Sequence, residues 1–234
     1  MTAYRTDRRA TDRDRAPSEA TLLSCAAVLF DCDGVLVDSE ATILRSWNQW
    51  ARQMGVDPGA VTPTIHGRRS RDTVAEFVEP ERHAEGLALI DRIEIDAADE
   101  VTPIPGAVEL LRSIPADRWA IVTSGSRALA QARVTAVGLP LPEVLITADD
   151  VVHGKPHPEG YLAAAAGLGV PATDCLVLED AVAGVRAARA ANVRSVLGVG
   201  DGDFGDAEPT LTIPDLRVVR WTSDGLEVRS TGSR

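Results

Sequence analysis

The sequence has few cysteines and no long apolar run. No stretch approaches the ~20 consecutive apolar residues that a membrane-spanning helix needs, so we expect no membrane association. The three cysteines, Cys25, Cys32 and Cys175, are odd in number and lie within or beside apolar stretches. This pattern indicates buried thiols in a reducing compartment rather than a disulfide framework, and it predicts a cytoplasmic protein.

Positive charge is also scarce. Lys and Arg number 24 against 35 Asp and Glu, for a formal net charge of −11. Since binding a polyanion needs a basic surface, we expect no nucleic-acid partner. A small phosphorylated substrate needs only a local positive site with a metal, so the acidic balance does not exclude one. Residues 1–22 contain several arginines and no apolar signal region, which predicts a disordered leader.

Short apolar stretches alternate with helical patterns along most of the 234 residues. Strands separated by single helices imply right-handed β–α–β units. We therefore predict an α/β fold with a Rossmann-like parallel sheet core in three layers. The expected strands are 26–30, 119–122, 143–146, 175–178 and 193–197, with 215–219 as a candidate last strand, and the expected helices are 40–54, 126–137, 158–168 and 181–191.

One stretch breaks this alternation. Residues 43–102 have a helical pattern with many charges and no strand. We expect an inserted α-helical cap here, over the carboxyl edge of the sheet, with Trp47 and Trp50 in its core; two long helices packed on the sheet are the alternative. The predicted domains are a disordered leader at 1–22, the catalytic core at 23–42 and 103–222, the helical cap at 43–102, and a flexible tail at 223–234.

Two aspartates follow the first predicted strand. Asp31 and Asp33 come directly after the apolar stretch 26–30, and Gly34 follows at once. The carboxyl ends of the strands are where open α/β sheets bind ligands. Close carboxylates repel one another, and a bound cation relieves the repulsion. A strand that runs into an Asx-Gly turn has the same local pattern, so this pair alone decides nothing.

Three further strand ends carry polar groups. The second strand leads to Thr123-Ser124-Gly125-Ser126, where N–H groups at the start of a helix form an anion site. The third strand leads to Gly154-Lys155-Pro156, and the fourth to Glu179-Asp180. Each alone is ordinary for a helix cap or a solvated charge. Four such ends on one sheet indicate a shared site.

These residues suit phosphoryl transfer through a covalent aspartyl-phosphate. Asp31 would attack phosphorus, and Asp33 would protonate the leaving oxygen and later activate a water. The phosphoryl oxygens would be held by a set of cationic and small polar residues. That set is Lys155, Thr123, Ser124 and Gly125.

The same site suits Mg²⁺, which prefers oxygen ligands and retains several waters. Its expected ligands are Asp31, the Asp33 carbonyl, Asp180, and Glu179 through water. The sequence has no Cys/His cluster at zinc spacing. No Gly-x-Gly-x-x-Gly follows the first strand, which disfavours a dinucleotide-binding protein.

With these motifs assembled, the chain resembles the haloacid dehalogenase superfamily of phosphohydrolases with a helical cap. The resemblance implies a Rossmann-like core, Mg²⁺ and the division of labour between Asp31 and Asp33 given above. The aspartate that matches Asp33 separates the phosphatases and phosphomutases of the superfamily from its dehalogenases. The matching segments are Asp31 to Asp38, Val122-Thr123-Ser124-Gly125, Gly154 to Pro158, and Leu178 to Val185.

Within the superfamily, the segment His66-Gly67-Arg68-Arg69-Ser70-Arg71-Asp72 resembles the His-Gly-x-x-x-x-Asp cap segment of sugar and polyol phosphatases. These include glycerol-3-phosphate and 2-deoxyglucose-6-phosphate phosphatases. The resemblance implies substrate contacts from His66 and from at least one of Arg68 and Arg69. A solvated basic patch is the alternative for the arginines, and a helix cap is the alternative for His66.

Two other functions stay open at this point. The β-phosphoglucomutases carry a histidine in the hinge helix, and Ile43 stands at the corresponding position, which favours a hydrolase. A catalytically silent phospholigand-binding protein would be expected to lack Asp31 or Asp33, and both are present. We therefore predict a Mg²⁺-dependent, monomeric phosphatase of a small phosphorylated sugar or polyol.

Overall fold

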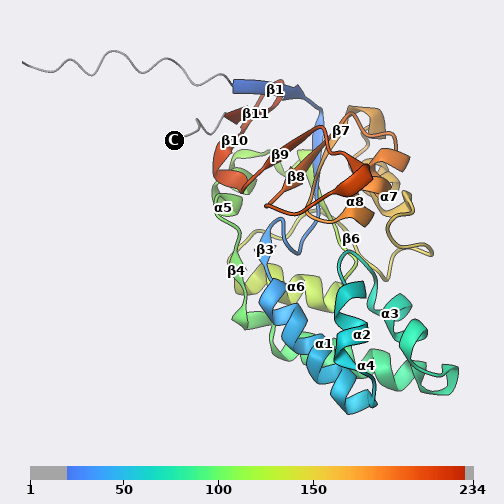
Figure 1. Cartoon of the computed structure of the whole chain (residues 1–234). Coiled ribbons are helices and arrows are strands. Elements are labelled where there is room, and N and C mark those ends of the chain that lie inside the picture. The colour runs from blue at the N-terminus through green and yellow to red at the C-terminus, as the bar shows by residue number, and fades with distance from the viewer. Residues whose placement is uncertain (1–19, 230–234) are drawn as a thin grey trace, which may run out of the picture.

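A computed structural model describes residues 20–229. Its centre is a six-stranded parallel sheet with the strand order β6-β5-β2-β7-β8-β9 (Figure 1). The α/β fold predicted from the sequence is confirmed, because five of the six strands overlap the predicted ones. The strands are β2 (Ala27–Phe30), β5 (Trp119–Val122), β6 (Val144–Ile146), β7 (Cys175–Glu179), β8 (Ser195–Val199) and β9 (Leu211–Ile213).

Helices cover both faces of this sheet and make the three predicted layers. Helices α7 (Glu159–Gly167) and α8 (Val182–Ala190) pack on one face against side chains that include Leu29 and Val177. Helices α5 (Ala107–Ser113) and α6 (Arg127–Ala136) pack on the other face, against Phe30 and Ile121 among others. All four residues of β2 have an exposed fraction of 0%, as expected for a central strand with an apolar layer on each side.

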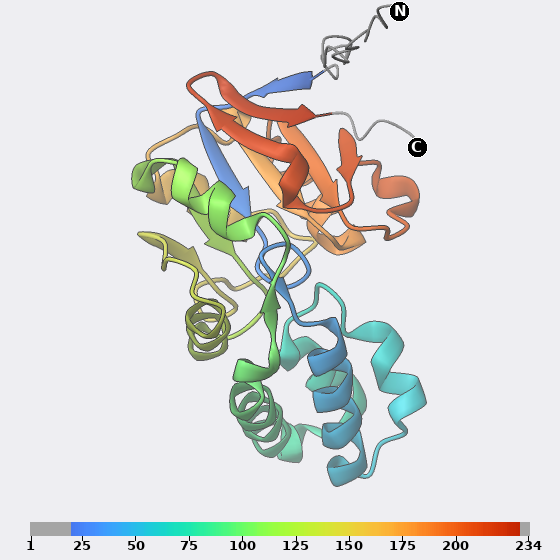
Figure 2. The same cartoon turned by 90° about the vertical axis from the view of Figure 1, so that its left-hand side faces the viewer.

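The helical cap forms a separate body beside the carboxyl edge of the sheet (Figures 1 and 2). Trp47 and Trp50 lie in its own apolar cluster, with ring centroids 5.1 Å apart, so the expectation that they belong to the cap core is confirmed. The helices of this body are α1 (Glu40–Met54), α2 (Pro58–Val61), α3 (Ser70–Phe77) and α4 (His83–Asp96). The two chain crossings between cap and core pair as short antiparallel strands, β3 (Val37–Asp38) and β4 (Thr102–Pro103).

Both ends of the described chain are more ordered than predicted. Strands β1 (Ala20–Ser24), β11 (Gly225–Arg229) and β10 (Val219–Thr222) form an antiparallel sheet. The leader prediction is therefore wrong for 20–22 and the tail prediction is wrong for 225–229, because Leu226 and Val228 are buried against the core. The rest of the predicted leader, 1–19, and of the tail, 230–234, lies outside the described residues.

The candidate last strand at 215–219 is also wrong. Asp215 accepts a hydrogen bond from the Arg217 N–H and begins a short 3₁₀ turn over Leu216–Val218. The sixth strand is instead β9, which pairs with β8. Cys25, Cys32 and Cys175 are buried free thiols, as expected. Among residues 20–229, no helix has the length and apolarity that a membrane crossing requires.

Candidate active site

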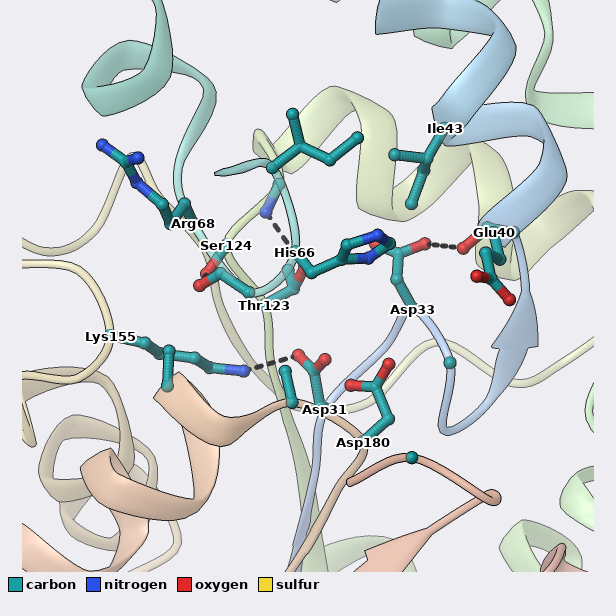
Figure 3. A pocket seen from close by; sticks show the side chains of 18 of the residues that line it. Asp31, Asp33, Glu40, Ile43, His66, Arg68, Thr123, Ser124, Lys155 and Asp180 are labelled. Carbon is teal, nitrogen blue, oxygen red and sulfur yellow. Dashed lines mark hydrogen bonds and ion pairs between the residues drawn. The ribbon is translucent and has the colours of Figure 1, made fainter. Parts of the chain in front are cut away.

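Three neighbouring strands bring the predicted motifs to one edge of the sheet. Strand β2 lies between β5 and β7, and Asp31, Thr123 and Glu179 stand at or just after the ends of these three strands. Lys155 reaches the same place from the loop between β6 and α7 (Figure 3). Asp31 and Lys155, 124 positions apart in the sequence, therefore meet, because parallel strands end at the same edge.

Lys155 is held between two carboxylates at the floor of the site. Its Nζ donates a hydrogen bond to Asp31 Oδ1 at 2.7 Å and another to Glu179 Oε1. The Tyr161 hydroxyl donates to the same Glu179 oxygen at 2.6 Å. Burial alone would lower the pKa of Lys155, but the two ion pairs outweigh burial and raise the pKa. Lys155 is therefore a fixed cation beside Asp31.

Negative charge exceeds positive charge at this floor. Burial raises the pKa of Asp31 to about 7, with further contributions from Glu179 and Asp33, while Lys155 opposes the rise. The pKa of Asp180 is also raised well above its usual value, by burial and then by Asp31 and Glu179. Three close carboxylates thus share one lysine, so the fully ionised site carries an excess of negative charge.

The donor set at the floor fits a hard divalent cation. Carboxylate oxygens of Asp31, Glu179 and Asp180 lie within 4.8 Å of one another. The Asp180 carboxylate also lies close to Gly34, where a Cβ would be 2.0 Å from Asp180 Oδ2. The loop after β2 therefore leaves room for this carboxylate only because residue 34 has no side chain. Such an oxygen-only, charge-rich group matches the ligands of Mg²⁺ and not those of zinc.

Asp33 is oriented by two donors. Its Oδ1 accepts hydrogen bonds from Ser39 Oγ at 2.6 Å and from Arg133 Nη1 at 2.8 Å. Arg133 is 1% exposed and also contacts Glu94 Oε1 of cap helix α4, at 3.1 Å. Burial raises the pKa of Glu94 to about 7, although Arg133 opposes the rise. Asp33 is therefore the first member of a chain of polar contacts that leads into the cap.

The cap and the core enclose a cavity of about 870 Å³ above this floor. His66 lies on the cap side near Asp33, whereas Arg68 points toward the rim (Figure 3) and pairs with Glu76 at 2.7 Å. The cavity brings together nearly all of the sequence-predicted site residues. Those that line it are Asp31, Asp33, His66, Arg68, Thr123, Ser124, Gly125, Lys155 and Asp180.

Comparisons with known proteins identify the family of the chain. A family model described as haloacid dehalogenase-like hydrolase matches residues 25–192. The chain belongs to the haloacid dehalogenase-like hydrolases. A hydrolase of known structure from Pseudomonas syringae has the same fold, with a TM-score of 0.71 and 26% identity over 81% of this chain and 93% of that one. The superfamily and the fold with a helical cap, both predicted from the sequence, are confirmed.

Two curated relatives are phosphatases by name. Hexitol phosphatase A of Escherichia coli is 42% identical over 63% of this chain and 70% of its own length. Glycerol-1-phosphate phosphohydrolase 2 of Saccharomyces cerevisiae is 34% identical over 69% of each chain. The predicted similarity to sugar and polyol phosphatases of the superfamily is therefore confirmed.

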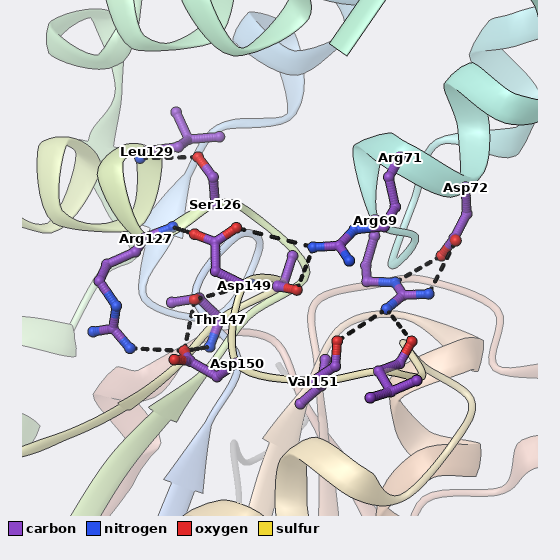
Figure 4. Close-up of polar contacts among 12 residues, drawn as sticks. Arg69, Arg71, Asp72, Ser126, Arg127, Leu129, Thr147, Asp149, Asp150 and Val151 are labelled. Atoms are coloured by element: carbon purple, nitrogen blue, oxygen red, sulfur yellow. Dashed lines mark hydrogen bonds and ion pairs between the residues drawn. The ribbon is translucent and has the colours of Figure 1, made fainter. Parts of the chain in front are cut away.

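Arg69 lies between the cap and the core of this haloacid dehalogenase-like hydrolase. It does not line the cavity, and all three of its guanidinium nitrogens donate hydrogen bonds to protein oxygens. Its partners are the Asp72 carboxylate and the carbonyls of Val151 and Val152 (Figure 4). The guanidinium thus joins the cap to the core, and the substrate contact expected from Arg69 stays a prediction.

Four residues near the site of this hydrolase were not predicted from the sequence, namely Ser39, Glu94, Arg133 and Tyr161. Two of them carried a usable signal. Arg133 shares the buried stripe of α6 with Leu129 and Val134, and Glu94 lies beside Ile90 and Ile93 on the buried face of α4. Since charged residues are almost never fully buried unless paired, each indicated a hidden partner of opposite charge. Nothing in the local pattern distinguishes Ser39 or Tyr161.

Proposed function

We propose that this protein is a Mg²⁺-dependent phosphatase that hydrolyses a small phosphorylated sugar or polyol through an aspartyl-phosphate on Asp31. The observation that carries the proposal is the convergence of Asp31, Lys155 and Asp180 at the floor of one cavity, with Asp33 held beside it. The named activities of the two curated relatives support the substrate class.

In the first step, a carboxylate oxygen of Asp31 forms a bond to phosphorus while the bond from phosphorus to the leaving oxygen breaks. Asp33 donates its proton to that oxygen, so the product leaves as an alcohol. Lys155, Thr123 and the loop at Ser124 and Gly125 stabilise the charge on the other phosphoryl oxygens.

In the second step, Asp33 takes a proton from water as the water oxygen attacks phosphorus, and the bond to Asp31 breaks. Phosphate departs and both carboxyl groups return to their starting states. Mg²⁺ held by Asp31, Asp180 and the Asp33 carbonyl would offset the negative charge of the phosphoryl group. Glu179 contributes mainly by fixing Lys155, since its carboxylate accepts from Lys155, Tyr161 and backbone N–H groups.

The cavity also supports hydrolysis over phosphoryl transfer between two positions of a sugar. Ile43 lines the cavity on hinge helix α1 and offers no hydrogen bond at the place where the mutases are expected to carry a histidine. The cap wall combines apolar Ile43 and Trp47 with polar His66 and Glu94, a mixture that suits a hydroxylated leaving group.

Phosphate release from a substrate panel tests this proposal. The panel contains glycerol phosphates, 2-deoxyglucose-6-phosphate, hexitol phosphates and β-glucose-1-phosphate, each with Mg²⁺ and with EDTA. We expect metal-dependent release from a polyol or sugar phosphate that Asp31→Asn abolishes. Conversion of β-glucose-1-phosphate to the 6-phosphate without release would contradict the proposal and indicate a mutase. Binding without turnover of any member of the panel would contradict it in favour of a silent binding protein.

A further inference from the structure

Arg69 is a nearly buried cation that joins the cap to the core. Its exposed fraction is 8%, and it stands immediately before helix α3. The Nε and Nη2 atoms donate to the two Asp72 oxygens at 2.8 and 3.0 Å. The remaining nitrogen, Nη1, donates to the carbonyl of Val152 at 2.8 Å and to that of Val151 at 3.4 Å (Figure 4). Asp72 thus orients the planar guanidinium so that its third nitrogen points at the core.

The core residues that Arg69 contacts lead directly to Lys155. Beyond the two carbonyls, the Arg69 side chain lies against Gly154: a Cβ there would be 2.5 Å from Arg69 Nε and 2.8 Å from Cδ. The position next to Lys155 is therefore free of a side chain where Arg69 crosses it. A lysine at 69 could supply one ammonium but not the bidentate fork together with the third donor.

The same cap segment contacts two other loops at the floor of the site. Ser124 Oγ donates to the Gly67 carbonyl at 2.9 Å. Gly67 also lies close to the loop after β7, since a Cβ there would be 3.1 Å from the Cβ of Ala181. His66 and Arg68, which line the cavity, stand on either side of this fixed glycine. The cap residues that line the cavity are thus placed by contacts with the loops that would hold the phosphoryl group.

We propose that Arg69 is a positioning residue that fastens the segment His66–Arg68 over the cavity by anchoring it to the loop that carries Lys155. This inference rests on the proposed function, because it assigns the leaving group to the cap and the phosphoryl group to the core. Loss of the anchor weakens contacts with the leaving group. It leaves in place the core residues that hold the phosphoryl oxygens.

The substitution Arg69→Met keeps the apolar length of the side chain and removes its donors. For the best substrate of the panel we expect KM to rise about tenfold or more with kcat changed by less than about threefold, the pattern of a lost binding contact. The inhibition constant for inorganic phosphate, which needs only the core residues, should change by less than about twofold. Arg69→Lys should give an intermediate KM, because it restores a charge without the fork.

A matched control is available on the same cap. Arg82 forms the same kind of i,i+3 ion pair, with Glu85, and its other contacts are with Met54 of the cap. Arg82→Met should leave KM and kcat at the wild-type values. An unchanged KM in Arg69→Met would overturn the proposal. An equal rise in KM and in the phosphate inhibition constant would also overturn it, since the effect would then be a general loss of the site.

Hydrogen exchange gives a second readout that does not depend on turnover. Amides of 65–72 and 148–155 should exchange faster in Arg69→Met than in wild type, while those of β2 should keep their protection. The Arg82→Met variant should match wild type in both segments. If wild type hydrolyses no phosphate ester, the proposed function fails, and the exchange result still decides whether Arg69 anchors the segment. Unchanged exchange in 65–72 and 148–155 would contradict the anchor itself.

Discussion

Arg133 Nη1 lies 2.8 Å from Asp33 Oδ1, although the two residues are 100 positions apart in the sequence. The same guanidinium contacts Glu94 of the cap at 3.1 Å. The carboxylate assigned to proton transfer is therefore fixed by a core helix that is itself in contact with the cap. Because proton transfer requires an acid within hydrogen-bond reach of the leaving oxygen, the orientation of Asp33 should affect the rate more than substrate affinity.

We expect Arg133→Met to lower kcat by about tenfold or more, since positioned acid–base groups contribute about 10²–10⁴-fold. Substrates whose leaving group is a stable phenolate need less protonation, so their kcat should fall less. Steady-state rates with a polyol phosphate and with an aryl phosphate measure this difference. Equal losses for both substrates would contradict a role for Arg133 in orienting Asp33.

The same substitution should destabilise the fold. Arg133→Met leaves Glu94, whose side chain is 5% exposed, as a buried carboxyl without its partner. Breaking a buried ion pair from one side costs about 3–5 kcal/mol in the free energy of unfolding. Adding Glu94→Gln to Arg133→Met should recover part of that loss, because the unpaired acid is removed. Urea unfolding of wild type, both single variants and the double variant measures the free energy of unfolding of each. Strictly additive losses would contradict an interaction between Arg133 and Glu94.

Two buried carboxyl groups predict how stability depends on pH. Burial raises the pKa of Asp31 and of Glu94 to about 7, from about 4 in an unfolded chain. The folded protein therefore binds these two protons more tightly than the unfolded chain does. Their contribution to the free energy of unfolding is fully present below about pH 4 and is lost as the pH rises through about 7. Thermal unfolding in EDTA should show Tm falling across this window.

Two comparisons check the origin of that fall. Glu94→Gln, which does not titrate, should make the decline shallower than in wild type. Added Mg²⁺ should raise Tm most at the alkaline end, where the cation no longer competes with protons at Asp31. A decline as steep in Glu94→Gln as in wild type would exclude Glu94 as a contributor.

The loop after β2 predicts a metal phenotype for Gly34→Ala. Gly34 has a φ of +78°, and a Cβ there would be 2.0 Å from Asp180 Oδ2. The new methyl group must displace the Asp180 carboxylate, so the Mg²⁺ concentration for half-maximal activity should rise about 10–100-fold, as for other changes that disturb ligand orientation.

Gly55→Ala is the matched control for Gly34→Ala. Gly55 has a similar φ of +76°, and no atom lies within 4 Å of a Cβ built there. The control therefore carries the same backbone strain without the collision. It should keep the wild-type Mg²⁺ dependence, and a comparable shift in both variants would attribute the effect to strain alone.

The sequence predicted the parts of the fold that depend on local pattern. The apolar stretch before Asp31 is β2, and the helix predicted at 40–54 begins and ends at Glu40 and Met54. The strand-end motifs converge because a parallel sheet brings its carboxyl ends together, a property of the topology that the alternation of strands and helices already implies.

Features that depend on distant partners were not predicted. Strand β1 is ordered by pairing with β11, which joins Ala20 to Arg229. The sequence offered a substrate contact or a solvated basic patch for Arg69, and only its approach to Asp72 and Val152 shows that its donors are used within the protein. A single sequence shows that a charged residue occupies a buried stripe, but the identity of its partner is set by tertiary packing.

The most direct test of the central claim is to trap the covalent intermediate. Asp33→Asn should allow attack by Asp31 on an aryl phosphate, whose leaving group needs little protonation, and should slow the hydrolysis that follows. Acid quenching, borohydride reduction and peptide mass spectrometry would then locate the phosphorylated residue. We predict modification at Asp31, and none in the Asp31→Asn, Asp33→Asn double variant. Modification at another residue, or modification that persists in the double variant, would contradict the mechanism.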